Sequence, residues 1–176
     1  MTRSSLAAPL RRKNGLQRSL LALFLSASTV AFGDSLGGAQ ESTDGAAITL
    51  ISMEKDCFGC SAGERLVLRR DGQASLVLTG KARHGTQDQL SLGTVGAEDF
   101  EALARLTLAQ GFTALQDNYD DTLSRDGAWT IISVEHSGGT VKQVFRRAGA
   151  GPAALDVIEA AIQQLRGRIA FERKHP

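Results

Sequence analysis

The chain has 176 residues, 42% of them hydrophobic and 22% charged, which excludes a wholly disordered protein and fits one domain of ordinary size. Five of the 20 basic residues and no acidic residue lie before residue 34, so the remainder holds 15 basic and 19 acidic residues, a net charge of −4. A mildly acidic domain without a long basic run gives no electrostatic reason to expect nucleic acid or an anionic membrane surface as partner.

Residues 1–33 have the layout of a secretory signal peptide. A cluster of basic residues precedes an apolar run over 20–32, and small residues follow it. This run is shorter than the about 20 residues of a membrane-spanning helix. We therefore expect a periplasmic or secreted protein with no membrane span after cleavage, and an uncleaved anchor helix is the alternative. Small-x-small cleavage sites occur at 31–33 and 37–39, and the sequence does not choose between them or fix the export route.

The residues after the signal divide into a leader, a domain and a tail. Residues 34–45 are small and polar, which predicts a flexible leader, and residues 171–176 are a charged tail. Between them, residues 46–170 are expected to form a single domain. Patterns of β-rich and alternating residues predict strands over 46–53, 65–70, 74–79, 81–92, 129–135 and 141–146. Asp71-Gly72 and Ser137-Gly138-Gly139 are hairpin turns between such runs.

Two helices are predicted from apolar stripes at helical spacing. The first carries Phe100, Leu103, Ala104 and Thr107 on one face and ends near Gly111; the second follows Pro152. Its stripe consists of Leu155, Ile158, Ile162, Leu165 and Ile169. Strands paired through short turns favour an antiparallel sheet. We expect an α+β two-layer sandwich, with an antiparallel sheet of about five or six strands and two helices on one face.

Both cysteines of the chain lie in the segment Cys57-Phe58-Gly59-Cys60, between the first two predicted strands. In an exported protein two cysteines usually pair, so a structural Cys57–Cys60 disulfide is expected. A thiol–disulfide redox role is the alternative, but it needs the first thiol at a helix amino terminus, and a strand pattern follows here. A metal site with His84 or His136 stays open, although no ligand spacing supports it.

The mature region resembles a bacterial exported domain-of-unknown-function family that opens with Cys-Phe-Gly-x-Cys-Pro. The similarity includes Cys57-Phe58-Gly59, the Asp71-Gly72 hairpin, Asp117-Asn118-Tyr119 and the turn at 149–152, in the same order. The family's second cysteine aligns with Ser61, whereas this chain has Cys60 one position earlier. The resemblance implies the fold and an exported location, and it implies no reaction or ligand.

The remaining candidate site residues lie between the two predicted hairpins. A cluster of four carboxylates could bind Ca²⁺, but its spacing does not match a calcium loop, and solvated acidic turns are common. Its members are Asp117, Asp120, Asp121 and Asp126. Tyr119 and Trp129 are candidates for an exposed binding patch, with a place in the core as the alternative. No catalytic motif is present, so no catalytic residue, metal or cofactor is assigned.

These observations favour an exported, non-enzymatic binding or structural module with a Cys57–Cys60 disulfide. Its partner is expected to be an unidentified protein or cell-envelope component. The alternative is a thiol–disulfide redox or redox-sensing protein that uses Cys57 and Cys60.

Overall fold

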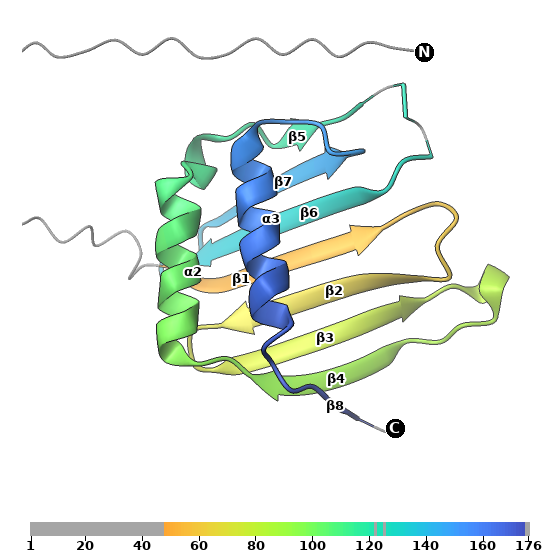
Figure 1. The fold of residues 1–176 in the computed structure, drawn as a ribbon, viewed down its shortest axis with the longest axis horizontal. Helices are drawn as coiled ribbons and strands as arrows, with labels where there is room; N and C mark the ends of the chain where they lie inside the picture. Colours follow the sequence, from red (N-terminus) through yellow and green to blue (C-terminus); the bar gives the residue numbers. More distant parts are fainter. Residues whose placement is uncertain (1–47, 122, 125, 175–176) are drawn as a thin grey trace, which may run out of the picture. The chain divides into compact units, whose positions relative to one another are not determined.

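The computed structural model describes residues 48–121, 123–124 and 126–174. The expected signal peptide and leader therefore lie outside the described residues. Within them, strands and helices follow in the order β1 (Ile48–Asp56), β2 (Ala62–Arg69), β3 (Gln73–Gly80), the 3₁₀ helix η1 (Ala82–His84), β4 (Gln89–Thr94), α2 (Ala97–Ala109), the 3₁₀ helix η2 (Phe112–Ala114), β5 (Asn118–Tyr119), β6 (Trp129–His136), β7 (Val141–Arg147), α3 (Ala153–Arg166) and β8 (Glu172–Arg173) (Figure 1).

The eight strands of the described residues form one mixed sheet in the order β5-β7-β6-β1-β2-β3-β4-β8. All neighbouring strands are antiparallel except β5 and β7, which run parallel. The fold is thus a sheet-dominated α+β fold.

The expected fold class, a two-layer sandwich with an antiparallel sheet of five or six strands, is wrong. The sheet has two further edge strands, β5 and β8, of two residues each, and one parallel pair. Two-residue strands are too short to show an alternating pattern, so only their tertiary partners define them. The Phe145 amide donates to the Asp117 carbonyl at 2.9 Å beside β5, and the Lys174 amide donates to the Leu90 carbonyl at 2.8 Å beside β8.

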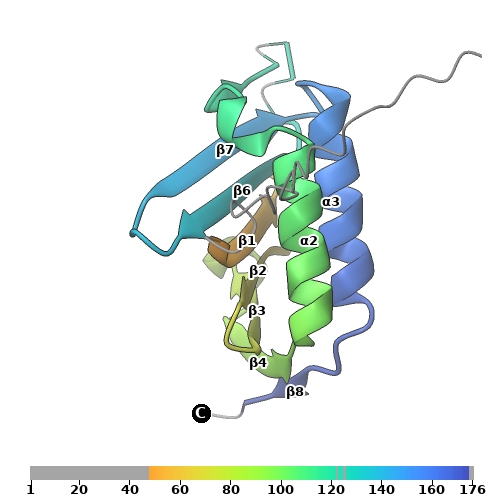
Figure 2. The same ribbon diagram turned by 90° about the vertical axis from the view of Figure 1, so that its left-hand side faces the viewer.

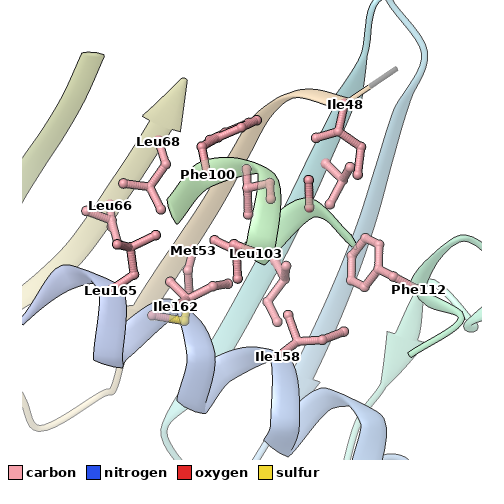
Figure 3. Close-up of a cluster of buried hydrophobic side chains, with 14 of the residues drawn as sticks. Ile48, Met53, Leu66, Leu68, Phe100, Leu103, Phe112, Ile158, Ile162 and Leu165 are labelled. Carbon is pink, nitrogen blue, oxygen red and sulfur yellow. The ribbon is translucent and has the colours of Figure 1, made fainter. Parts of the chain in front are cut away.

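The two α-helices lie on the same face of the sheet (Figure 2). Their buried stripes are Phe100, Leu103, Ala104 and Thr107 of α2, and Leu155, Ile158, Ile162 and Leu165 of α3. They pack against the helix-facing side chains of the central strands, together with Phe112 (Figure 3). From the sheet come Ile48, Ile51, Met53, Leu66, Leu68, Ala74, Ile132, Val134 and Val144. This apolar cluster supplies the main stabilisation of the domain.

The segment 81–92, expected as one edge strand, contains two different structures. Residues Ala82–His84 form η1, which ends at Gly85 with φ 65°, and β4 begins only at Gln89. Glycine adopts this left-handed conformation without steric cost, so the chain can reverse here. The turn carries Lys81 and Thr86 toward the cysteine segment.

No helix in the described part of the chain is long and apolar enough to cross a membrane.

Candidate functional site

Cys57 and Cys60 form a disulfide in the turn between β1 and β2, with their Cα atoms 5.3 Å apart. The Cys60 amide also donates a weak 3.4 Å hydrogen bond to the Cys57 carbonyl across this turn. The pairing is the one expected from the sequence. After Cys60 the chain enters β2 at Ala62, so this turn joins two strands of a hairpin and does not lead into a helix.

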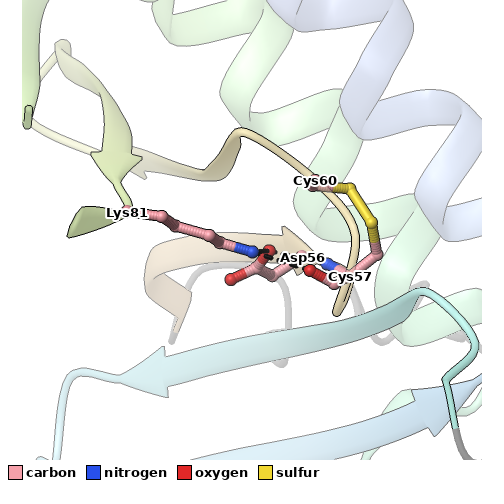
Figure 4. The surroundings of a disulfide bond; sticks show 4 residues. All are labelled: Asp56, Cys57, Cys60 and Lys81. Carbon is pink, nitrogen blue, oxygen red and sulfur yellow. Dashed lines mark hydrogen bonds and ion pairs between the residues drawn. A yellow bond between two sulfur atoms is a disulfide. The ribbon is translucent and has the colours of Figure 1, made fainter. Parts of the chain in front are cut away.

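Lys81, at the end of β3, holds the disulfide turn from the side (Figure 4). Its ammonium donates to the Asp56 carboxylate and, at 2.6 Å, to the Cys57 carbonyl. The same carboxylate accepts the Cys57 amide at 2.6 Å. Asp56 also leans over Gly63, where a Cβ would come within 3.0 Å of the carboxylate. Three neighbouring strands therefore fix the position of the first cysteine.

The connection between β3 and β4 also holds the disulfide turn in place. The Thr86 hydroxyl donates to the Ser61 carbonyl at 2.6 Å and accepts the Lys81 amide at 2.7 Å. Gly80 lies so close to the backbone of Gln87 that a Cβ there would be only 2.5 Å away. The disulfide, the ammonium and this loop together fix the shape of one end of the sheet.

At this end the helix-facing surface of the sheet changes from apolar to polar within one pleat. Strand pairing aligns Leu66, Met53, Ile132 and Val144 across β2, β1, β6 and β7 as one apolar row. One step further along the same strands, pairing aligns Glu64, Lys55, Thr130 and Arg146. Because residues two apart share a face, these four side chains also point toward α3. We call them the polar row.

Helix α3 supplies countercharges above the polar row. Glu159 Oε2 lies 3.1 Å from Lys55 Nζ, and Arg166 Nη2 donates to Glu64 Oε2 at 2.7 Å. Arg146 Nη1 lies 2.9 Å from Asp156 Oδ1 and 3.4 Å from Glu159 Oε1. Each fixed charge of the row therefore has an opposite charge within ion-pair distance.

Arg146 is the most unusual member, because its side chain is only 5% exposed. Its Nη1 atom is fully buried, and neither Asp156 nor Glu159 offers it hydrogen-bond geometry within the described residues. Burying a guanidinium costs free energy, and a buried donor without a hydrogen bond adds to this cost. An unsatisfied buried polar group in a native structure calls for an explanation, and a functional role is one of them. Arg146 was not among the residues selected from the sequence, although its place after Val144 on the helix-facing side of β7 is readable from the hairpin register.

A cavity of about 530 Å³ opens beside the polar row and the disulfide. Small or apolar residues form part of its lining, among them Cys60, Ala62, Ala128, Trp129 and Ala148. The polar part of the lining comes from Lys55, Asp56, Glu64, Thr130, Arg146, Glu159 and Gln163. A concave, largely preformed space with a few fixed polar groups is the usual form of a small-molecule site. We call it the disulfide cavity.

The other residues selected from the sequence have separate places. Asp117 pairs with Lys142, and the Arg147 Nε donates to Asp120 at 2.7 Å. Tyr119 is half-buried in β5 and packs on the core, and its hydroxyl accepts the Gln116 amide at 3.1 Å. Of the candidates beyond the cysteines, Trp129 is the one that lines the disulfide cavity.

Asp121 stabilises the turn that follows it in the chain. Its carboxylate accepts the Ser124 hydroxyl at 2.6 Å and the Leu123 amide at 3.0 Å, and these hydrogen bonds lower its pKa below the ordinary value. In the described residues, no three His, Cys, Asp or Glu side chains gather closely enough to hold a metal ion. His136 pairs with Ile48, at the end of β1 opposite to Cys57, whereas His84 is exposed in η1.

The chain was compared with protein-family models and with curated proteins, and it matches none of them.

Proposed function

We propose that this chain is an exported, non-enzymatic binding module whose Cys57–Cys60 disulfide shapes one wall of a ligand site. The disulfide cavity is that site, and its polar row fixes the ligand's orientation. The single observation that carries the proposal is a buried, incompletely hydrogen-bonded Arg146 beside a cavity of about 530 Å³. Replacing such a buried ionic group by apolar residues is often neutral or stabilising, so stability alone gives no reason for its presence.

Export and a periplasmic or secreted location belong to the same proposal. A bonded cysteine pair is typical of oxidising compartments, and the basic and apolar pattern of residues 1–33 is typical of a signal peptide. The resemblance of the mature region to an exported domain family supports the same location. The ligand is expected to come from a protein or another component of the cell envelope.

The redox alternative has less support. A thiol of the thioredoxin type reacts because a helix amino terminus lowers its pKa, whereas Cys57 and Cys60 lie between two antiparallel strands. The alternative predicts insulin-reduction activity that is lost in Cys57→Ser. We expect the wild-type domain and Cys57→Ser to give the same rate as buffer.

The binding proposal can be tested with a fragment library and two neighbouring substitutions on α3. Gln163 lines the disulfide cavity, whereas Gln164 is exposed on the same helix outside it. Gln163→Phe therefore places an aromatic ring at the cavity, and Gln164→Phe adds the same ring elsewhere. Saturation-transfer NMR on residues 46–176 would identify small neutral and zwitterionic fragments that bind the wild-type domain.

We expect a group of fragments to bind the wild type and Gln164→Phe and to lose binding in Gln163→Phe. Two results would contradict the proposal: a library that gives no binders, or the same binders with all three proteins. Circular dichroism spectra of the three proteins establish that each is folded before the comparison.

A further inference from the structure

A second depression lies at the same end of the sheet, on the face that the helices leave open. It has a volume of about 310 Å³. Asp56, Trp129 and Arg147 are aligned across β1, β6 and β7 by the strand pairing. They follow or precede polar-row residues by one position, so their side chains point to the opposite face. Cys57, Phe58, Lys81, Arg83 and Gly127 complete the lining. We call this depression the open-face groove.

The open-face groove carries an excess of positive charge. Its three cations are Lys81, Arg83 and Arg147. Asp56 neutralises Lys81, and Asp120 neutralises Arg147. Among the described residues, Arg83 has no carboxylate partner within ion-pair distance, so one positive charge remains. A groove with one such charge is suited to a singly charged anionic group.

Arg83 is held by an aromatic ring. Its guanidinium carbon lies 4.6 Å from the centre of the Phe58 ring, a cation–π arrangement. A guanidinium that stacks on a ring makes contact through its flat face. The N–H donors at its edge remain available, and they match the two oxygens of a carboxylate. Phe58 itself is 68% exposed even with Arg83 over its ring, which leaves apolar surface free for a ligand. Trp129 offers a second aromatic surface in the groove.

We propose that the open-face groove is a carboxylate-binding site, in which Arg83 takes the carboxylate while Phe58 and Trp129 contact the carbon chain that bears it. This site shares Asp56 and Trp129 with the disulfide cavity, but Arg83 and Phe58 belong to the open-face groove alone. It therefore goes beyond the binding function proposed above. The two coplanar oxygens of a carboxylate match the N–H donors at the edge of the Arg83 guanidinium, and one carboxylate group balances the one charge that the groove leaves unpaired. The carboxylate has two sources, a free small acid or an acidic side chain of a peptide.

The fluorescence of Trp129 provides a direct measurement, because it is the only tryptophan of the chain. The domain is titrated with glutarate and, as the uncharged control, with glutaramide. A blocked tri-aspartate peptide and its tri-asparagine counterpart form the second arm, and inorganic phosphate forms the third. We expect a saturable change with glutarate, with the acidic peptide, or with both, and none with the amides. The arm that responds identifies the source of the carboxylate.

Substitutions then assign the binding to the groove. Arg83 is exposed in η1, so Arg83→Gln removes the charge without disturbing the core. Arg65→Gln is the matched control, because Arg65 is an exposed cation on the same face of β2 outside the groove. We expect Arg83→Gln to weaken carboxylate binding about tenfold or more, since a hydrogen-bonded charge is lost. Arg65→Gln and Gln163→Phe should leave it unchanged.

Four results of the titrations and the arginine substitutions would overturn the assignment. These are no saturable response to either carboxylate probe, equal binding of glutarate and glutaramide, a response to phosphate alone, or equal losses in Arg83→Gln and Arg65→Gln. Loss of glutarate binding in Gln163→Phe would also contradict it, because the acid would then occupy the disulfide cavity. This last variant separates the present proposal from the fragment-binding proposal, so either can fail alone.

Discussion

Lys81 and Asp56 form an ion pair that crosses β2. Both side chains are largely buried, with 17% and 21% of their areas exposed. The strand order places β2 between the two residues, so the pair connects the end of β3 to the end of β1. Because the same ammonium donates to the Cys57 carbonyl, the pair also positions the disulfide turn between the disulfide cavity and the open-face groove.

The Lys81–Asp56 pair should contribute measurably to stability. In a double-mutant cycle of Lys81→Met and Asp56→Asn, we expect a coupling of about 1 kcal/mol in the free energy of unfolding, because the pair is partly desolvated. Urea unfolding of the four proteins measures it. Lys142 and Asp117 form the control pair, whose carboxylate is 83% exposed, and its coupling should be under about 0.5 kcal/mol. Equal couplings in the two cycles would contradict the role given to Lys81.

Removal of the disulfide should weaken the domain only moderately. The bond closes a loop of four residues, from Cys57 to Cys60, and the chain-entropy relation gives about 2 kcal/mol for a loop of this size. We therefore expect Cys57→Ser/Cys60→Ser to fold and to lose about that much in urea unfolding. Wild-type protein reduced with dithiothreitol is the control and should lose a similar amount. A double variant that is unfolded at 25 °C would show that the turn has a larger structural role.

Arg146 and Glu159 should respond to substitution as a unit. Arg146→Met leaves the Glu159 carboxylate, 16% exposed, with Lys55 as its remaining cation, and should cost about 3 kcal/mol. Arg146→Met/Glu159→Leu removes both buried charges, and we expect it to be within about 1 kcal/mol of the wild type or more stable. Thermal and urea unfolding measure both. A double variant as unstable as the single one would show that the polar row is needed for stability, which would contradict a row retained for binding.

Asp121 should titrate below the ordinary aspartate value of 3.8, because Ser124 and the Leu123 amide hydrogen-bond to its charged form. A carboxyl group with a lowered folded-state pKa stabilises the fold above its unfolded pKa. This contribution is lost as the pH falls through the folded pKa. Carboxyl ¹³C NMR of the Asp121 resonance measures the pKa, and Ser124→Ala should raise it toward the ordinary value. A Ser124→Ala variant with an unchanged pKa would exclude the hydroxyl as the main cause.

The periodic part of the fold could be predicted from the sequence. Five of the six longer strands and both helices follow from alternation, helical stripes and glycine turns, because these patterns record which side of each element is buried. The exception is β4, which was expected from residue 81 but begins only at Gln89. In the predicted stripe that starts at Leu155, four of the five residues are buried in α3, whereas Ile169 lies beyond the end of the helix at Arg166 and is only partly buried. The same patterns could not reveal β5 and β8, because two residues form strands only where an existing edge offers them hydrogen bonds.

The candidate site depended on register and could be predicted only in part. The sequence by itself determined that Cys57 and Cys60 share one turn and that Trp129 begins a strand. Only the tertiary structure brought Glu64, Lys55, Thr130 and Arg146 into one row under α3, and Asp56, Trp129 and Arg147 into another on the opposite face. Taken one at a time, these residues are of types that are common at the ends of strands. What distinguishes them is the pairing of β1 with β6, which joins two hairpins that are distant in the sequence, and long-range pairing of this kind leaves no local pattern.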